Sequence, residues 1–306
     1  MRIKGFHYFG TGAGLPSLIR NVSSMALDFE SEWFLFDCGE GTQQRIMSSP
    51  LKMTKLTHIF ISHFHGDHLY GLPGLLATMQ LQGVETPLTL VGPKGLKEYL
   101  TFTFKVSGSH FKREMNFIEI EPDTTEVTEL LSCSSFRVLT ARLKHRVPCY
   151  GYRICLNDIP GKFNSEKADD LGIPNDVSRR HLVNGTSITL ENGTKITPDM
   201  VISSPRKNKH FTYITDTSVC ENITALAKGS HYLHHECTFM DDEVELAKKS
   251  GHCTLNQVLT IANKCNVEQL HLAHFSSRYD THSLQKELKK NPYKIIFTYD
   301  KQSILL

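Results

Sequence analysis

The sequence predicts an α/β (α+β) fold in which two mixed β-sheets pack face to face between outer helices, an αββα sandwich with one inserted arm. Two observations support this prediction. Short apolar, β-branched runs typical of strands alternate with helix patterns in two comparable halves of the chain. Between the halves, residues 157–199 contain many Gly, Pro, Asn, Asp and Lys and few long apolar runs, which indicates a partly mobile insertion rather than core.

The first half of the chain supplies most of the predicted strands. A glycine-rich turn at 10–16 follows the first strand; it is not a dinucleotide fingerprint, because the third glycine of GxGxxG is missing and Pro16 interrupts any helix. Helices are expected from about residue 42, from about residue 72 and over 92–104. Strands are expected at 3–9, 25–29, 33–36, 56–61, 88–91, 117–120, 136–140 and 150–154.

The second half repeats the pattern with fewer strands and longer helices. Within the arm, one short helix is expected over 165–171. Outside it, helices are expected over 241–249, 255–263 and 283–290. Strands are expected at 212–215, 231–235, 269–273 and 295–298.

Composition bounds the class of protein. The chain has 306 residues, of which 40% are hydrophobic, enough for a large core. No run approaches the roughly 18 apolar residues of a membrane span, and the start lacks a signal-peptide pattern, so we expect a cytoplasmic location and no membrane partner. The eight cysteines are scattered without a CxxC pair, which indicates reduced thiols.

The formal net charge of +2 does not by itself indicate nucleic-acid binding. Local basic groups would have to supply phosphate contacts. The stretches at 142–146 and 206–209 are candidates, and each is equally well explained as a solvated face.

The densest polar cluster follows the strand predicted at 56–61. His63, His65, Asp67 and His68 place three imidazoles and a carboxylate within six residues, on an expected loop at the strand end. Imidazole nitrogen and carboxylate oxygen are ligands suited to Zn²⁺. A solvated histidine-rich loop is the alternative, which this density of ligands disfavours.

Three more candidate ligands, His145, Asp216 and His274, each follow a predicted strand end. Loops at one edge of stacked sheets can converge, and seven ligands are enough for two metal ions, with Asp216 as the bridging carboxylate. A lone histidine such as His145 is usually not a ligand, so its assignment depends on this convergence. Asp37, in a loop after another strand, either orients a metal-bound histidine or caps the helix from about residue 42.

Several longer motifs resemble one family in order along nearly the whole chain. They are FDCGEGTQ at 36–43, ISHFHGDHLYGLPGLL at 61–76, HECTF at 235–239 and HFSSRY at 274–279. The chain resembles the metallo-β-lactamase superfamily and, within it, the tRNase Z family of tRNA 3′-processing endoribonucleases in its short form. The resemblance implies a single metallo-β-lactamase domain over 1–306, with the arm at 157–199 as a tRNA exosite.

The resemblance also implies a site with two Zn²⁺ ions per subunit, for which Mn²⁺ or another divalent ion could substitute. Asp67 would orient or deprotonate the attacking water, and His252 would protonate the departing 3′-oxygen. Glu236 is our hypothesis for the group that holds His252 in the right tautomer. One ion would be held by His63, His65, His145 and Asp216, and the second by Asp67, His68, Asp216 and His274.

The implied reaction removes the 3′ trailer of precursor tRNA and leaves a 3′-hydroxyl on the tRNA and a 5′-phosphate on the trailer. Family members are homodimers in which one subunit's arm grips the tRNA that the other cuts, so a homodimer is expected. Residues 175–180 depart from the family's glycine-proline segment, and Arg179 and Arg180 are the expected phosphate contacts there. Arg278 of HFSSRY is a third candidate substrate contact.

Two other functions remain open from the sequence. The first is a small-molecule hydrolase of the same superfamily, acting on esters, sulfates or cyclic phosphates; deletion of the arm would distinguish it. The second is a metal-free RNA-binding protein on a decayed enzyme fold, against which the complete set of ligands argues.

Overall fold

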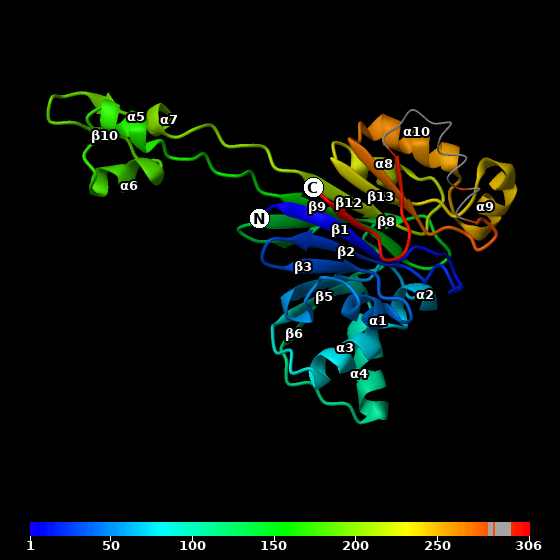
Figure 1. Cartoon of the computed structure of the whole chain (residues 1–306). Coiled ribbons are helices and arrows are strands. Elements are labelled where there is room, and N and C mark those ends of the chain that lie inside the picture. The colour runs from blue at the N-terminus through cyan, green and yellow to red at the C-terminus, as the bar shows by residue number, and fades with distance from the viewer. Residues whose placement is uncertain (281–283, 285–294) are drawn as a thin grey trace. The chain divides into compact units, whose positions relative to one another are not determined.

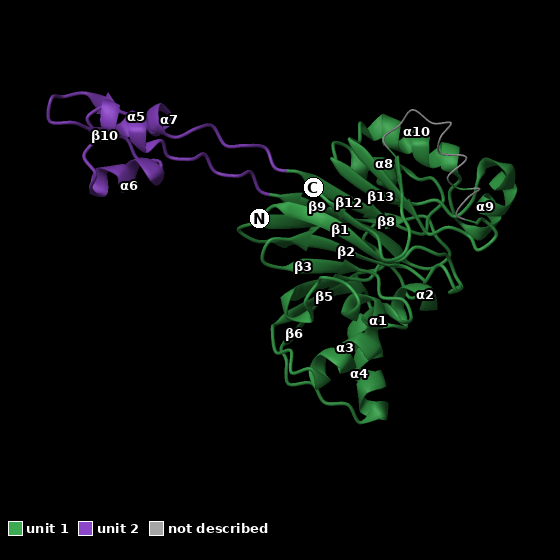
Figure 2. Cartoon of the chain, in the orientation of Figure 1, with its two compact units in different colours: residues 1–156, 209–306 green, residues 157–208 purple. Residues whose placement is uncertain are grey.

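The computed structural model describes residues 1–280, 284 and 295–306. It divides the chain into two compact units (Figure 2). Unit 1 comprises residues 1–156 and 209–306, and unit 2 comprises residues 157–208. Among the described residues, no helix combines the length and apolar character needed to cross a membrane.

The first sheet of unit 1 is mixed, with β1 to β3 antiparallel and β3 to β6 parallel. Within the described residues its strand order is β16-β1-β2-β3-β4-β5-β6. The strands are β1 (Ile3–Gly10), β2 (Ser24–Phe29), β3 (Trp33–Phe36), β4 (Leu56–Phe60), β5 (Leu88–Pro93), β6 (Met115–Ile120) and β16 (Ser303–Leu305).

The second sheet is also mixed, with β12 to β15 parallel and β7, β8, β9 and β12 antiparallel in turn. Its order over the described part of the chain is β15-β14-β13-β12-β9-β8-β7. The strands are β7 (Thr128–Ser132), β8 (Phe136–Leu143), β9 (Cys149–Leu156), β12 (His210–Ile214), β13 (Tyr232–Glu236), β14 (Gln269–Ala273) and β15 (Ile295–Phe297).

An aromatic layer joins the two sheets. Phe36 of β3 lies with its ring centroid 4.9 Å from Phe60 and 5.4 Å from Phe211 of the second sheet. Phe60 in turn lies 5.2 Å from Tyr152 of β9. These side chains are fully buried, and aromatic groups of this size contribute most of the apolar area that a core removes from water.

Helices cover the outer faces of both sheets, as Figure 1 shows. Buried leucines of α3 and α4 pack in one cluster with outward side chains of the first sheet, and α8 and α10 do the same on the second. The predicted αββα sandwich is therefore confirmed. In the part of unit 1 that the structure describes, the helices with defined bounds are α1 (Thr42–Met47), α2 (Gly66–Leu69), α3 (Leu72–Leu81), α4 (Leu96–Ser107), α8 (Glu221–Ala227), α9 (Val244–Ser250) and α10 (Leu255–Cys265), with short 3-10 turns at Met53–Lys55 and Asp241–Glu243.

Several sequence-based assignments in unit 1 need correction. The edge strands β7 and β16 and the helix α8 were not predicted, because short, half-exposed elements carry weak hydrophobic periodicity. Asp67 and His68 lie in the helical turn α2 rather than in a loop. The helix predicted over 283–290 lies outside the described residues, except for residue 284.

Unit 2 contains α5 (Ser165–Asp170), α6 (Val177–Val183), the hairpin β10 (Ile188–Thr189) and β11 (Lys195–Ile196), and α7 (Pro198–Val201). It has a small apolar core of its own, which the sequence did not predict. Backbone bridges Phe163↔Ile202 and Ile159↔Arg206 extend the unit past the predicted end at 199. The core residues are Ala168, Ile173, Leu182, Ile196 and Val201.

Candidate active site

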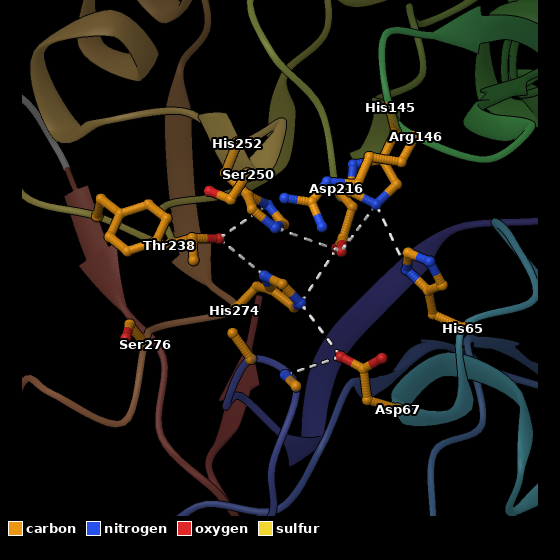
Figure 3. A pocket seen from close by; sticks show the side chains of 13 residues that line it. His65, Asp67, His145, Arg146, Asp216, Thr238, Ser250, His252, His274 and Ser276 are labelled. Carbon is orange, nitrogen blue, oxygen red and sulfur yellow. Dashed lines mark hydrogen bonds and ion pairs between the residues drawn. The ribbon is translucent and has the colours of Figure 1, made fainter. Parts of the chain in front are cut away.

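Strand topology brings the candidate ligands to one edge of unit 1. In the second sheet β8, β12 and β14 all point the same way, because β8 and β12 are both antiparallel to β9, and β12 to β14 are parallel. His145, Asp216 and His274 follow their ends. The segment after β4 of the first sheet meets them there, around a cavity of about 220 Å³ (Figure 3).

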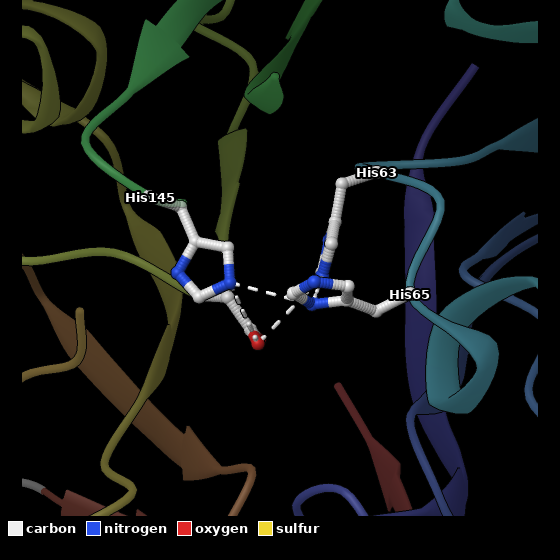
Figure 4. A group of neighbouring side chains, drawn as sticks. His63, His65 and His145 are labelled. Carbon is white, nitrogen blue, oxygen red and sulfur yellow. Dashed lines mark hydrogen bonds and ion pairs between the residues drawn. The ribbon is translucent and has the colours of Figure 1, made fainter. Parts of the chain in front are cut away.

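The first ligand group comprises His63, His65, His145 and Asp216, whose ligand atoms all lie within 4.8 Å of one another. Nδ1 of His65 lies 3.0 Å from Nε2 of His63 and 3.4 Å from Nε2 of His145. Figure 4 shows these three imidazoles converging. Oδ2 of Asp216 lies 3.7 Å from His63 Nε2 and 3.8 Å from His145 Nε2, so the carboxylate completes the group.

The second ligand group comprises Asp67, His68 and His274. Nε2 of His68 lies 3.3 Å from Nε2 of His274 and 3.3 Å from Oδ2 of Asp67. The other oxygen of Asp216, Oδ1, lies 3.1 Å from His274 and 3.3 Å from His68. Asp216 therefore presents one carboxylate oxygen to each group.

The outward ring nitrogens of four candidate ligands have hydrogen-bonding partners. Nδ1 of His68 lies 2.7 Å from Asp37, and Nδ1 of His63 lies 2.9 Å from the Ser62 hydroxyl. Nδ1 of His145 lies 3.0 Å from the Gly251 carbonyl oxygen, and Nδ1 of His274 lies 2.9 Å from the Thr238 hydroxyl. Such outer contacts orient metal-binding imidazoles, and the inward nitrogens remain available. This donor set fits a divalent metal ion.

The two alternatives for Asp37 can now be separated. The N-cap residue of α1 is Gly41, which has a left-handed φ of 72°, and no side chain caps this helix. Asp37 is therefore not its cap. Its carboxylate instead accepts hydrogen bonds from Ser62 N–H and Oγ, at 2.7 and 2.8 Å, and from the Tyr213 hydroxyl at 2.8 Å. Held in this way, Asp37 orients His68.

Burial and charge set the protonation of the cluster. Burial lowers the pKa of His63 and His145, which leaves these imidazoles neutral and able to bind a metal. Burial alone would lower the pKa of His68, but Asp216, Asp67 and Asp37 together raise it well above its usual value.

His252 lies beside the two ligand groups and is paired with a buried acid. Its Nδ1 lies 3.0 Å from Oε1 of Glu236, and its Nε2 lies 4.0 Å from Asp216 in the cavity. Burial lowers the pKa of His252, but the charge and hydrogen bond of Glu236 outweigh this and raise it to about 9. Glu236 also accepts hydrogen bonds from Thr217 N–H, Thr238 N–H and Cys253 N–H, which fix its orientation.

Sequence reasoning missed several groups at the cavity. The backbone N–H of Gly14 donates to Oδ2 of Asp67 at 2.8 Å. Thr238 lies between Glu236 and His274, donating to the carboxylate at 2.6 Å. Arg146 also lines the cavity. All three lie in stretches noted in the sequence, namely the glycine-rich turn at 10–16, the HECTF motif and the basic stretch at 142–146, but nothing in these stretches assigned the individual groups to the site.

The three arginines predicted to contact substrate have different surroundings. Arg278 pairs with Glu243 and lies over the Phe239 ring, at 5.5 Å, outside the set of residues that line the cavity. The guanidinium of Arg179 is bound within unit 2, by Asp169 and by two backbone carbonyls, and its side chain is 14% exposed. Arg180 is exposed on α6.

Comparison with known proteins identifies the family. A model of the beta-lactamase superfamily domain matches residues 32–160. Ribonuclease Z of Halalkalibacterium halodurans is 37% identical over 288 residues, which covers 93% of this chain and 91% of the relative. Ribonuclease Z of Lactiplantibacillus plantarum is 39% identical over 297 residues, covering 96% and 94%. The chain belongs to the ribonuclease Z family.

A solved structure agrees with this ribonuclease Z assignment. Human tRNase Z, short form, superposes with a TM-score of 0.72 at 28% identity, and the match covers 98% of both chains. A long form RNase Z from yeast has a TM-score of 0.70 at 18% identity, which supports the fold alone; the match covers 99% of this chain and 41% of the yeast chain.

Proposed function

We propose that this chain is a metal-dependent tRNA 3′-endonuclease. It cuts precursor tRNA at the trailer junction and leaves a 3′-hydroxyl on the tRNA and a 5′-phosphate on the trailer. One observation carries the proposal: in a chain of the ribonuclease Z family, two ligand groups share the carboxylate of Asp216 and lie beside the His252–Glu236 pair.

The proposed cofactor is a pair of Zn²⁺ ions per subunit, which Mn²⁺ or another divalent ion could replace. When bound, the ions would activate water and neutralise charge on a phosphoryl oxygen. His63, His65 and His145 would hold one ion and Asp67, His68 and His274 the other. Asp216 would bridge them through its two oxygens.

Proton transfer is assigned to two residues. Asp67 would orient the water that attacks phosphorus or accept its proton. Burial raises the pKa of Asp67, but His68 and His274 outweigh this, lower it and keep the carboxylate ionised. The bond from phosphorus to the 3′-oxygen then breaks, and Nε2 of His252 would donate the proton that makes this oxygen a hydroxyl. With a pKa of about 9, His252 is protonated at neutral pH in the metal-free chain. A bound cation nearby would lower this pKa.

Unit 2 is the proposed exosite for the body of the tRNA. Phosphate recognition needs cations with free donors. Arg180, exposed on α6, meets this need better than Arg179, whose guanidinium is occupied by Asp169 and backbone carbonyls. Arg278 would need to leave Glu243 to contact substrate.

A homodimer is proposed, with an apolar face on α4 as its contact. Phe102 and Val106 of α4 are 67% and 71% exposed. Phe102, Phe64 and Tyr99 line a groove of about 770 Å³ beside them. Exposed apolar surface of this kind is typical of protein interfaces.

The cytoplasmic location expected from the sequence stays a prediction.

The deciding experiment incubates the metal-loaded chain with a precursor tRNA that carries a 3′ trailer, beside a trailer-free control. The new ends are mapped to single-nucleotide resolution. One cut at the trailer junction, lost in Asp67→Ala, is the expected result. Hydrolysis of a small phosphodiester without any tRNA cleavage would contradict the proposed substrate.

A further inference from the structure

Asp300 lies in the turn between β15 and β16, and its carboxylate reaches both ends of the loop formed by residues 11–21. Oδ1 accepts hydrogen bonds from the Thr11 N–H at 3.1 Å and the Thr11 hydroxyl at 2.9 Å. Oδ2 accepts from the Asn21 N–H at 2.6 Å and lies 3.7 Å from the guanidinium of Arg45. The Asp300 side chain is 5% exposed, so water competes little for these donors.

The middle of this loop borders the candidate active site. Ala13 N–H donates to the Phe275 carbonyl oxygen at 3.0 Å, and Gly14 N–H donates to Oδ2 of Asp67 at 2.8 Å. Gly14 has a φ of 69°, in the left-handed region that favours glycine. Ala13 and Gly14 both line the cavity. The position of the Gly14 N–H therefore depends on where the loop ends are held.

A second contact ties the loop to the same C-terminal segment. The guanidinium of Arg20 donates to the Thr11 hydroxyl at 2.7 Å and to the Thr298 carbonyl oxygen at 3.1 Å. It also lies 4.9 Å from the ring centroid of Phe275, which stacks on Phe297 of β15. The segment around Asp300 thus supports the loop and the residue that follows His274.

We propose that Asp300 is a positioning residue for the reaction. By holding Thr11 and Asn21, it keeps the Gly14 N–H against the Asp67 carboxylate and so orients the group that accepts the proton of the attacking water. The inference rests on the proposed function, because that function gives Asp67 this role. An asparagine at position 300 would turn an NH₂ group toward one set of N–H donors, and the loop would shift. A shift of about 1 Å near reacting atoms lowers rates by about 100-fold.

Asp28→Asn is the matched control for Asp300→Asn. Asp28 is a buried acid in β2 of the first sheet, 5% exposed, and its ion pairs are with Lys4 and His7 of β1. Metal-loaded full-length variants are compared by zinc content, Tm, and kcat and KM for bis(p-nitrophenyl) phosphate. Asp300→Asn is expected to lower kcat by roughly 10- to 100-fold with KM and zinc content near wild type, and Asp28→Asn to change kcat by less than about twofold.

A double-mutant cycle with Asp67→Asn separates positioning from a general structural role. If Asp300 acts through Asp67, its substitution costs less than about threefold in kcat once Asp67 has been replaced. Equal losses in both backgrounds, or a wild-type kcat in Asp300→Asn, would overturn the proposal. If Asp300→Asn does not fold, Thr11→Val removes one of the three hydrogen bonds to Asp300 and enters the same cycle.

Failure of the proposed function would look different. Wild-type chain that hydrolyses the small diester but leaves precursor tRNA uncut contradicts the tRNA substrate. The kcat comparison on the small diester still decides the role of Asp300 in that case.

Discussion

Glu236 and His252 form a pair whose function one substitution can test. Glu236→Gln removes the charge that raises the pKa of His252, so this pKa should fall. A general acid is active only while protonated, and the decline of the single-turnover rate on the alkaline side should therefore move to lower pH. At neutral pH we expect a loss of roughly 10- to 100-fold. Tm and bound zinc, measured in parallel, report whether the fold and metals are retained.

The control for this substitution is Glu243→Gln, which removes a half-buried acid that pairs with Arg278 outside the cavity lining. It should leave both the rate and the pH profile unchanged on a small phosphodiester. An unchanged single-turnover rate and pH profile in Glu236→Gln would contradict the assigned role.

Asp216 and His274 should differ in how many metal ions they hold. Of the two ligand groups described above, Asp216 presents an oxygen to each, whereas His274 contacts members of the second. We expect about two zinc ions per wild-type chain, about one in His274→Ala, and fewer than one in Asp216→Ala. Elemental analysis after dialysis gives these numbers. Equal zinc content in the two variants would rule out Asp216 as the bridge.

Among secondary-structure elements, strands were the most predictable part of this molecule. Ile59 and Phe60 of β4 and Leu270 and Leu272 of β14 lie in compact apolar runs, and a buried strand leaves that pattern in any sequence. The ends of these strands could therefore be predicted, and with them the candidate ligands that follow. The half-exposed edge strand β7 could not be predicted, because its alternation of apolar and polar residues is weak.

Contacts between distant segments could not be predicted from the residues alone. Thr238 and His274 are 36 residues apart, and Gly14 and Asp67 are 53 apart; only the sheet order brings each pair together. His252 was assigned only through what the family resemblance implies, since a histidine before a helix has no distinctive pattern of its own. The core of unit 2 escaped prediction because its apolar residues are spread over short elements.

Unit 2 can be removed without interrupting the sheet that carries the site. Cys155 of β9 and His210 of β12 are paired neighbours, so a short glycine linker can replace residues 157–208. The shortened chain should retain zinc and hydrolyse bis(p-nitrophenyl) phosphate at a rate near wild type. Its cleavage of precursor tRNA should fall by at least about 100-fold if unit 2 supplies phosphate contacts.

Arg180→Glu offers a milder version of this experiment. It should weaken tRNA binding and reduce its salt dependence, as expected when one phosphate contact is lost. The activity of this variant on the small diester should not change.

For the chain that lacks residues 157–208, tRNA cleavage at the wild-type rate would show that unit 1 alone recognises the substrate.

The assembly of the whole molecule is testable on the apolar face of α4. Phe102→Asp together with Val106→Asp places two charges on this face, where a dimer contact would have to bury them at a high desolvation cost. Analytical ultracentrifugation should give a dimer for wild type and a monomer for the double variant. The control double variant, Lys97→Asp and Lys105→Asp, changes charge beside the groove without changing its apolar face. If the Phe102→Asp and Val106→Asp variant is still a dimer, the interface lies elsewhere.

The stability of unit 1 should fall in mild acid because it buries neutral histidines. Burial lowers the pKa of His271 to about 3, below the usual 6.5 of an unfolded chain. Protonation therefore favours the unfolded state, and the stability that this histidine contributes is present above pH 6.5 and is lost as the pH falls toward 3. Between pH 6.5 and 5 the loss is about 2 kcal/mol for this one group, at about 1.4 kcal/mol per pH unit.

Denaturant unfolding of chelator-treated protein at the two pH values measures this loss of unfolding free energy without a contribution from metal release. His271→Leu gives up the hydrogen bond to Tyr8 and is less stable at pH 6.5, but its stability should change with pH by about 2 kcal/mol less than that of wild type. Parallel pH dependence in the two proteins would mean that His271 is not the titrating group.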